Sequence, residues 1–142
     1  MALQGHAQAP RSGRKGHKLF TLEEANRSLP YVSRIIEDIR AAYQHALTLQ
    51  QRMDRPMPDD TLQALQTEYQ ESIDRLNRFV EELQAVGVDL KDYEMGLIDF
   101  PAMHEGREVN LCWRRGEDKV LAWHEVDSGF AGRQDIATYK PE

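Results

Sequence analysis

The sequence predicts an α+β fold, with a long antiparallel helical hairpin followed by a small three-stranded antiparallel meander. Apolar residues recur every three or four positions over two long segments, which a proline-rich break separates. Beyond residue 87 the apolar period changes to two, which is typical of half-buried strands. The length of 142 residues favours one domain over 19–142, after a basic tail at 1–18 that we expect to be disordered.

The first helix is predicted over about 22–53. Thr21 and Glu24 have the spacing of a capping box, in which each side chain accepts a hydrogen bond from the other residue's amide. Pro30 lacks an amide proton, so we expect it to kink the helix or to restart it from Ser28. Its apolar stripe comprises Leu29, Val32, Ile36, Ile39, Tyr43, Ala46 and Met53.

The second helix is predicted over about 60–86. Two prolines in the segment 55–60 end the first helix, and Asp59 or Asp60 can cap the second. Gly87 is placed to end it as a left-handed glycine. Its stripe comprises Leu62, Leu65, Tyr69, Ser72, Leu76, Phe79, Leu83 and Val86.

The apolar stripe of the first helix is wider than one partner helix covers. Ile35, Ala42 and Leu49 lie beside its main seam. We therefore expect the chain to form a homodimer or a higher oligomer through its helices.

Three strands are predicted over about 96–100, 108–115 and 119–126. Pro101 ends the first strand, and the second and third alternate between apolar and polar positions. The loop near residue 116 leaves two registers open. In one register Trp113 shares a face with His124, and in the other it shares a face with Trp123.

Composition and charge exclude several classes of protein. The whole chain has a net charge of −6. The tail carries four basic residues and no acid, so the rest of the chain has a net charge of −10. That charge argues against nucleic acid as a partner of the folded domain. No apolar run is long enough to cross a membrane, and no secretory signal is expected. One cysteine fits a cytoplasmic location and excludes a multi-cysteine zinc site.

An ordered set of motifs resembles one known family. The motifs are FTLEEAN (20–26), Leu29-Pro30, GLIDFPA (96–102), GREV (106–109), LCWR (111–114), WHE (123–125) and GFAGRQ (129–134). Together they resemble the bacterial family named domain of unknown function 2203, over roughly residues 19–137. The resemblance implies a small cytoplasmic bacterial protein. It implies no activity, cofactor or functional residue.

Polar residues nevertheless gather at one end of the predicted meander. We expect the strand end at His124–Asp127 and the loop through Arg133 to form one face of a small polar pocket, completed by Asp99 or Arg107. The candidate ligand-binding residues are Asp99, Arg107, His124, Glu125, Asp127 and Arg133. A small anion is the expected ligand, and an internal network of arginine and carboxylate groups without a ligand is the alternative.

From the sequence alone, a metal ion is less favoured than an anion as the ligand of this pocket. Its candidate ligands are His104, His124 and Asp127, and Asp127 could orient the imidazole of His124. Cys112 has no activating base nearby in sequence, so we expect it to pack as a small strand residue.

No catalytic residue or cofactor is predicted. The function expected first is a non-catalytic, homo-oligomeric binding or scaffold protein. The alternative is a small enzyme or a metal- or anion-binding protein around His124, Asp127 and Arg133.

Overall fold

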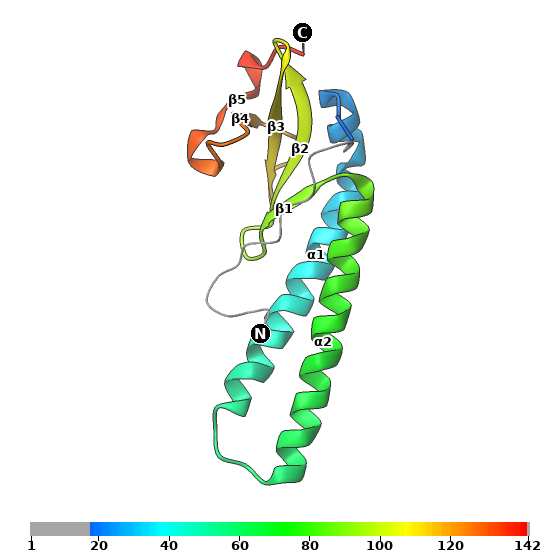
Figure 1. Cartoon of the computed structure of the whole chain (residues 1–142), viewed down its shortest axis with the longest axis vertical. Coiled ribbons are helices and arrows are strands. Elements are labelled where there is room, and N and C mark those ends of the chain that lie inside the picture. Colours follow the sequence, from blue (N-terminus) through cyan, green and yellow to red (C-terminus); the bar gives the residue numbers. More distant parts are fainter. Residues whose placement is uncertain (1–17, 142) are drawn as a thin grey trace.

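The structure, a computed structural model, describes residues 18–141, and the predicted disordered tail lies almost entirely outside this range. Two long helices form an antiparallel hairpin, and a small sheet packs against one end of it (Figure 1). The predicted α+β class, with a helical hairpin before an antiparallel meander, is confirmed. Within residues 18–141, no helix combines the length and the apolar character needed to span a bilayer.

Helix α1 spans Leu22–Met53 and begins at the predicted capping box. The Thr21 hydroxyl accepts from the Glu24 amide at 3.0 Å, and the Glu24 carboxylate accepts from the Thr21 amide at 3.0 Å. The helix runs through Pro30 without interruption, so the predicted restart at Ser28 does not occur.

Helix α2 spans Asp59–Val86 and ends at Gly87, which has a φ of 100° in the left-handed region. Gly87 therefore ends the helix as predicted, because this conformation costs glycine little. The start of the helix differs from the prediction. Pro58 occupies the N-cap without a side-chain hydrogen bond, and Asp59 and Asp60 lie in the first turn. There their negative charges interact favourably with the positive end of the helix dipole, and the Asp60 carboxylate accepts from the Thr61 amide at 2.8 Å.

The sheet has five antiparallel strands in chain order, β1-β2-β3-β4-β5. Their bounds are Asp89–Asp92, Leu97–His104, Arg107–Arg114, Ala122–Glu125 and Gln134–Asp135. The three predicted strands correspond to β2, β3 and β4, and the short strands β1 and β5 extend the meander at its two edges. A single turn of 3-10 helix, η1 (Phe130–Gly132), lies between β4 and β5.

Strand β2 continues past Pro101, where the sequence predicted its end. Strand β1 pairs with β2 only as far as Asp99, so the next part of β2 has no strand on that side. The Pro101 carbonyl points to this open edge and accepts from the Phe20 amide at 2.7 Å. A proline is tolerated here because its missing amide proton would also face the edge.

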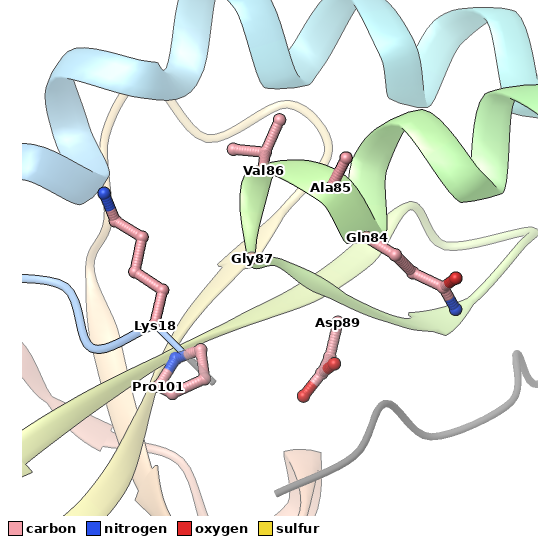
Figure 2. Close-up of a pocket in the computed structure, with 7 residues that line it drawn as sticks. All are labelled: Lys18, Gln84, Ala85, Val86, Gly87, Asp89 and Pro101. Atoms are coloured by element: carbon pink, nitrogen blue, oxygen red, sulfur yellow. The ribbon is translucent and has the colours of Figure 1, made fainter. Parts of the chain in front are cut away.

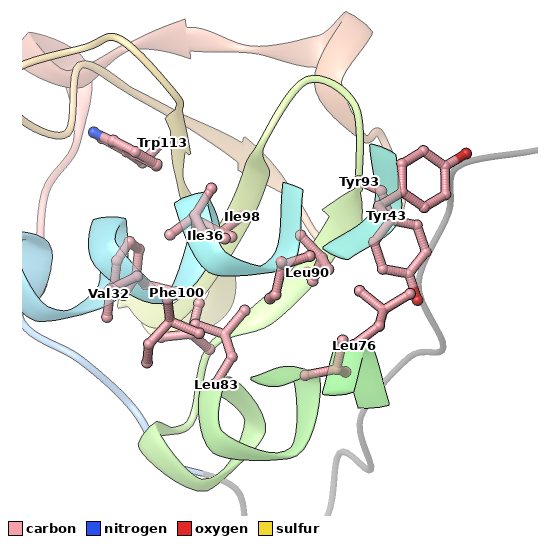
Figure 3. Packing of buried hydrophobic residues seen from close by; sticks show 14 of the residues in the cluster. Val32, Ile36, Tyr43, Leu76, Leu83, Leu90, Tyr93, Ile98, Phe100 and Trp113 are labelled. Carbon is pink, nitrogen blue, oxygen red and sulfur yellow. The ribbon is translucent and has the colours of Figure 1, made fainter. Parts of the chain in front are cut away.

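The register of β3 against β4 places Leu111 opposite Trp123 and Asn110 opposite His124. Trp113 therefore shares a face with Trp123, which is the second of the two registers left open. This face, with Ile98 and Phe100, packs on the helices and forms one core with side chains such as Ile36 and Leu83 (Figure 3).

The core also encloses the residues from which an oligomer was predicted. Ile35, Ala42 and Leu49 are buried in the single chain. The stated reason for an oligomeric interface is therefore wrong, because these side chains are already covered. The oligomeric state itself stays a prediction.

Candidate metal centre

Three chemically different side chains meet on the sheet face that points away from the helical core. Asp99 on β2 lies directly opposite Cys112 on β3, and His124 on β4 lies opposite Asn110, two positions before Cys112. Residues opposite one another in an antiparallel pair project to the same side. The exposed fractions of Asp99, Cys112 and His124 are 1%, 0% and 2%. The three strands thus hold a carboxylate, a thiol and an imidazole together out of water.

Both ring nitrogens of His124 have a fixed partner. Nδ1 lies 2.7 Å from the Glu125 carbonyl oxygen, and Nε2 lies 2.9 Å from Asp99 Oδ1. A carbonyl only accepts, so Nδ1 carries a proton and donates it. Nε2 is then the nitrogen that faces the carboxylate. The sequence offered Asp127 as a residue that could orient this ring, but the carboxylate that contacts it is that of Asp99.

The electrostatics of His124 favour its charged form. Burial lowers the pKa of His124, but hydrogen bonds to Asp99, to Cys112 and to the Glu125 carbonyl, with the charge of Asp99, raise it to about 10. A buried carboxylate next to a buried imidazole therefore forms an ion pair in the metal-free protein.

Arg133 covers the thiol from the segment that follows η1. Its Nε lies 3.3 Å from Cys112 Sγ, and its Nη2 donates to the Cys112 carbonyl at 3.3 Å. Its Nη1 and Nη2 also donate to the Glu117 carboxylate, at 3.0 and 2.8 Å. Arg133 is therefore fully engaged by Glu117 and Cys112, as the alternative of an internal network anticipated.

The side chains of Asp99, Cys112 and His124 offer ligand atoms that converge on one point. One oxygen, one sulfur and one ring nitrogen all lie within 4.8 Å of one another. Ligand atoms bound to a tetrahedral ion lie roughly 3.3–3.8 Å apart, given metal–ligand distances of about 2.0–2.3 Å. Small side-chain movements would bring the three atoms to that spacing.

Asn110 adds an unsatisfied polar atom next to this cluster. It is 2% exposed, lies opposite His124 on the same face, and its Oδ1 has no hydrogen-bond partner within residues 18–141. A buried acceptor without a donor costs free energy, of about 1–3 kcal/mol. A water molecule or other donor held at the cluster would satisfy it.

A pocket of about 520 Å³ opens beside the cluster. Asp99 and His124 form part of its wall, whereas Cys112 lies behind that wall. The remaining lining comes from the end of β1, the turn after it and the first residue of β2, and from the segment leading into η1. These residues are Lys91, Asp92, Met95, Leu97, Val126, Asp127, Ser128, Gly129 and Phe130.

The structure brings together only some of the predicted site residues. Asp99, His124 and Asp127 line the pocket. Arg107 and Glu125 instead form an exposed ion pair with each other. Arg133 lies outside the lining and binds Glu117.

His104, a weaker metal candidate, lies on the opposite face of the sheet from Asp99, because the two positions differ by an odd number along β2. Its ring packs 4.2 Å from the Trp123 ring, and its Nδ1 accepts from the Lys140 amide at 2.9 Å. The geometry therefore separates His104 from the cluster.

A smaller pocket of about 210 Å³ lies where α2 runs into β1 (Figure 2). Lys18, Gly87, Asp89 and Pro101 contribute to its lining. It brings no histidine or cysteine together, so the chemistry points to the larger pocket.

Sequence reasoning did not place Cys112 and Asn110 beside Asp99 and His124. The available signal was their alternation on one strand, because Asn110 and Cys112 share a face in any register. Their placement with His124 depended on the β3–β4 register, which the long connection at residues 115–121 left open.

A family model described as an uncharacterized conserved protein, DUF2203, matches residues 18–136. The chain belongs to the DUF2203 family. This confirms the resemblance drawn from the ordered motifs. No curated protein and no solved structure matches the chain significantly. The description of the DUF2203 family names no activity, so the role of the cluster has to be argued from its geometry.

Proposed function

We propose that this DUF2203 protein binds a divalent transition-metal ion, with zinc as the first choice, through Asp99, Cys112 and His124. The main observation in support is that three buried side chains on adjacent strands bring their ligand atoms within 4.8 Å of one another. Carboxylate oxygen, thiolate sulfur and imidazole nitrogen are all zinc ligands. A soft sulfur beside a nitrogen also argues against magnesium or calcium.

The surroundings of the three ligands match those of known metal ligands. A metal-binding histidine usually donates its second ring proton to a carbonyl or carboxylate, and His124 donates Nδ1–H to the Glu125 carbonyl. The Arg133 guanidinium supports the Cys112 sulfur in the same way. The carboxylate of Asp99 and a bound thiolate would balance the charge of a divalent ion.

The same geometry argues against a cysteine nucleophile activated by histidine. In a nucleophilic triad the two ring nitrogens divide between the nucleophile and an acidic residue. In His124 the Glu125 carbonyl occupies Nδ1, and Nε2 faces Asp99. With Nδ1 occupied by the carbonyl, Asp99 and Cys112 share the one remaining nitrogen, Nε2, which is not the division found in a nucleophilic triad.

The charges of the pocket argue against a simple anion as its ligand. The prediction of an anion rested on the arginines, but Arg107 is paired with Glu125 and Arg133 with Glu117. In the pocket lining His124 is paired with Asp99, and Lys91 is the other basic side chain, against the acidic Asp92 and Asp127. A cation at Asp99 fits this balance better.

The experiment is titration of the metal-free protein with Co²⁺, which reports tetrahedral coordination and cobalt–sulfur charge transfer in its absorption spectrum. We expect one equivalent to bind, and excess Zn²⁺ to displace it. Cys112→Ser should remove the charge-transfer band, and Asp99→Asn and His124→Gln should weaken binding by about 10-fold or more.

Matched controls test whether the loss is specific. His45→Gln changes an exposed histidine paired with Glu68, and Asp118→Asn changes an exposed carboxylate. Both controls should bind Co²⁺ as the unaltered protein does. The proposal fails if the unaltered protein gives no tetrahedral spectrum, or if Cys112→Ser retains the sulfur band.

A further inference from the structure

We infer that the metal ion keeps one coordination position that opens into the pocket, and that this position receives a small zwitterion. Its carboxylate would bind the metal beside Lys91, and its ammonium group would pair with Asp127. This inference rests on the proposed metal site and adds the class of molecule that it takes.

The open position follows from the number of protein ligands. Within residues 18–141, the cluster contains three side chains of the usual metal-binding types. Structural zinc sites use four protein ligands, whereas sites that receive an outside molecule use three and leave the fourth position to it.

The direction of the open position follows from the wall of the pocket. Asp99 and His124 line the pocket, and Cys112 does not. Arg133 covers Cys112, donating to both Sγ and the carbonyl oxygen, and its guanidinium lies 5.1 Å from the ring centroid of the pocket-lining Phe130. An ion held by these three residues would therefore meet the pocket at Asp99 and His124.

The charges on the pocket indicate a molecule with both signs. Lys91 and Asp127 both line it, and neither makes an ion pair or a side-chain hydrogen bond within residues 18–141. Asp92 differs, because its Oδ1 accepts from the Glu94 and Met95 amides, each at 2.9 Å. Among the described residues, Lys91 and Asp127 are therefore a cation and an anion without hydrogen-bond partners on the wall of this pocket.

The rest of the lining suits a short apolar spacer between these charges. Met95, Leu97, Val126 and Phe130 contribute to the pocket, and the Phe130 side chain is partly exposed. Methylene groups that join a carboxylate to an ammonium group would lie against these side chains. A short ω-amino acid has this arrangement.

The test uses three probes of similar length on the Co²⁺-loaded protein: 4-aminobutyrate, butyrate and butylamine. Each is titrated while the cobalt spectrum is followed. We expect 4-aminobutyrate to change the spectrum at a concentration about threefold to tenfold lower than butyrate, as one partly exposed ion pair would give. Butylamine, without a carboxylate, should bind more weakly than either.

Variants separate the two charged contacts. Asp127→Asn should reduce the affinity of 4-aminobutyrate to that of butyrate, without weakening butyrate. Lys91→Gln should weaken both carboxylates to a similar degree. Asp118→Asn, an exposed carboxylate outside the pocket, should change neither affinity.

The outcomes distinguish this inference from the metal site itself. If the cobalt spectrum forms but responds to none of the probes, the open position is wrong and the metal site stands. If butyrate binds as tightly as 4-aminobutyrate, or Asp127→Asn keeps the preference, the assignment of a zwitterion is wrong. If Co²⁺ does not bind, both proposals fall together.

Discussion

The buried pair of His124 and Asp99 determines how the metal-free protein responds to pH. The folded-state pKa of His124 is about 10, above its ordinary value of 6.5, because the contacts to Asp99 and Cys112 outweigh the effect of burial. A raised pKa means that the folded state holds this proton more tightly than the unfolded state does. The pair therefore stabilises the fold fully below about pH 6.5, and less as pH rises towards 10.

We therefore predict that the free energy of unfolding of the metal-free protein falls between about pH 6.5 and about pH 10. Urea denaturation at several pH values measures this slope. The double variant Asp99→Asn with His124→Gln removes both charges and should show a flatter dependence. An equal slope in both proteins would mean that other groups control the pH response.

Arg133 is the second residue whose environment leads to a prediction. Its side chain and that of Glu117 are 21% and 18% exposed, so the pair is largely withdrawn from water. Arg133→Gln should destabilise the protein by about 1–3 kcal/mol, because the Glu117 carboxylate loses its charged partner and keeps only the Arg114 amide as donor, and the Cys112 carbonyl loses the Arg133 donor. Chemical denaturation measures the change.

Arg107→Gln is the matched control, since Arg107 pairs with Glu125 at the surface. It should leave the urea midpoint nearly unchanged, because solvent screens exposed ion pairs. Equal effects of the two variants would show that the Arg133 pair is no more protected than a surface pair.

For single residues, the sequence identified candidate site residues better than it identified the residues that contact them in the fold. Asp99 and His124 were recognised as site candidates by their type and their place at the ends of strands. Cys112 was set aside because nothing near it in sequence could activate it. Its neighbours come from other strands, and a shift of one residue in register would have turned them to the other face.

Among the elements, the helices were predictable because their ends carry local signals. Thr21 and Glu24 start α1, and the left-handed Gly87 ends α2. Both signals act through hydrogen bonds made within a few residues. Strands β1 and β5 carry no such signal, since they have four and two residues. They exist because a neighbouring strand offers them hydrogen bonds, and the sequence of a short strand does not encode its partner.

The seam between the helices leads to a prediction at the scale of elements. Leu76 is 1% exposed in the middle of α2. Leu76→Ala should cost roughly 2–5 kcal/mol, since it removes buried apolar atoms and leaves a cavity. Leu121→Ala, at a site 39% exposed, should cost much less. If the two variants share one urea midpoint, the seam contributes less than its burial indicates.

For the molecule as a whole, oligomerisation through the helices stays a prediction. The hairpin extends well beyond the sheet, so its outer half packs mainly on itself (Figure 1). Within residues 18–141, the most exposed large apolar side chains are Leu19, Tyr31, Leu121 and Phe130, of which Tyr31 alone lies on a helix of the hairpin. Light scattering at micromolar concentration measures the molar mass in solution and so tests this prediction. The mass of one chain, 16.4 kDa, would refute an oligomer.

Metal binding should also be visible in the stability of the whole chain. An ion that binds only the folded state adds about 2.7 kcal/mol at 100 times its dissociation constant. Zn²⁺ should therefore raise the melting temperature, and Cys112→Ser should lose most of that gain. A gain that survives Cys112→Ser would place the ion elsewhere on the chain.

The chain-order arrangement of the strands affects how quickly the protein folds. Asp99, Cys112 and His124 come from three consecutive strands, so forming the cluster requires only two neighbouring loops to close. The helix start joins the sheet through contacts such as the Val120 amide with Asn26, which are 94 residues apart. Short loops close faster than long ones. We expect the meander to assemble the ligand cluster early and the first turn of α1 to dock late, so that an ion could bind before folding is complete.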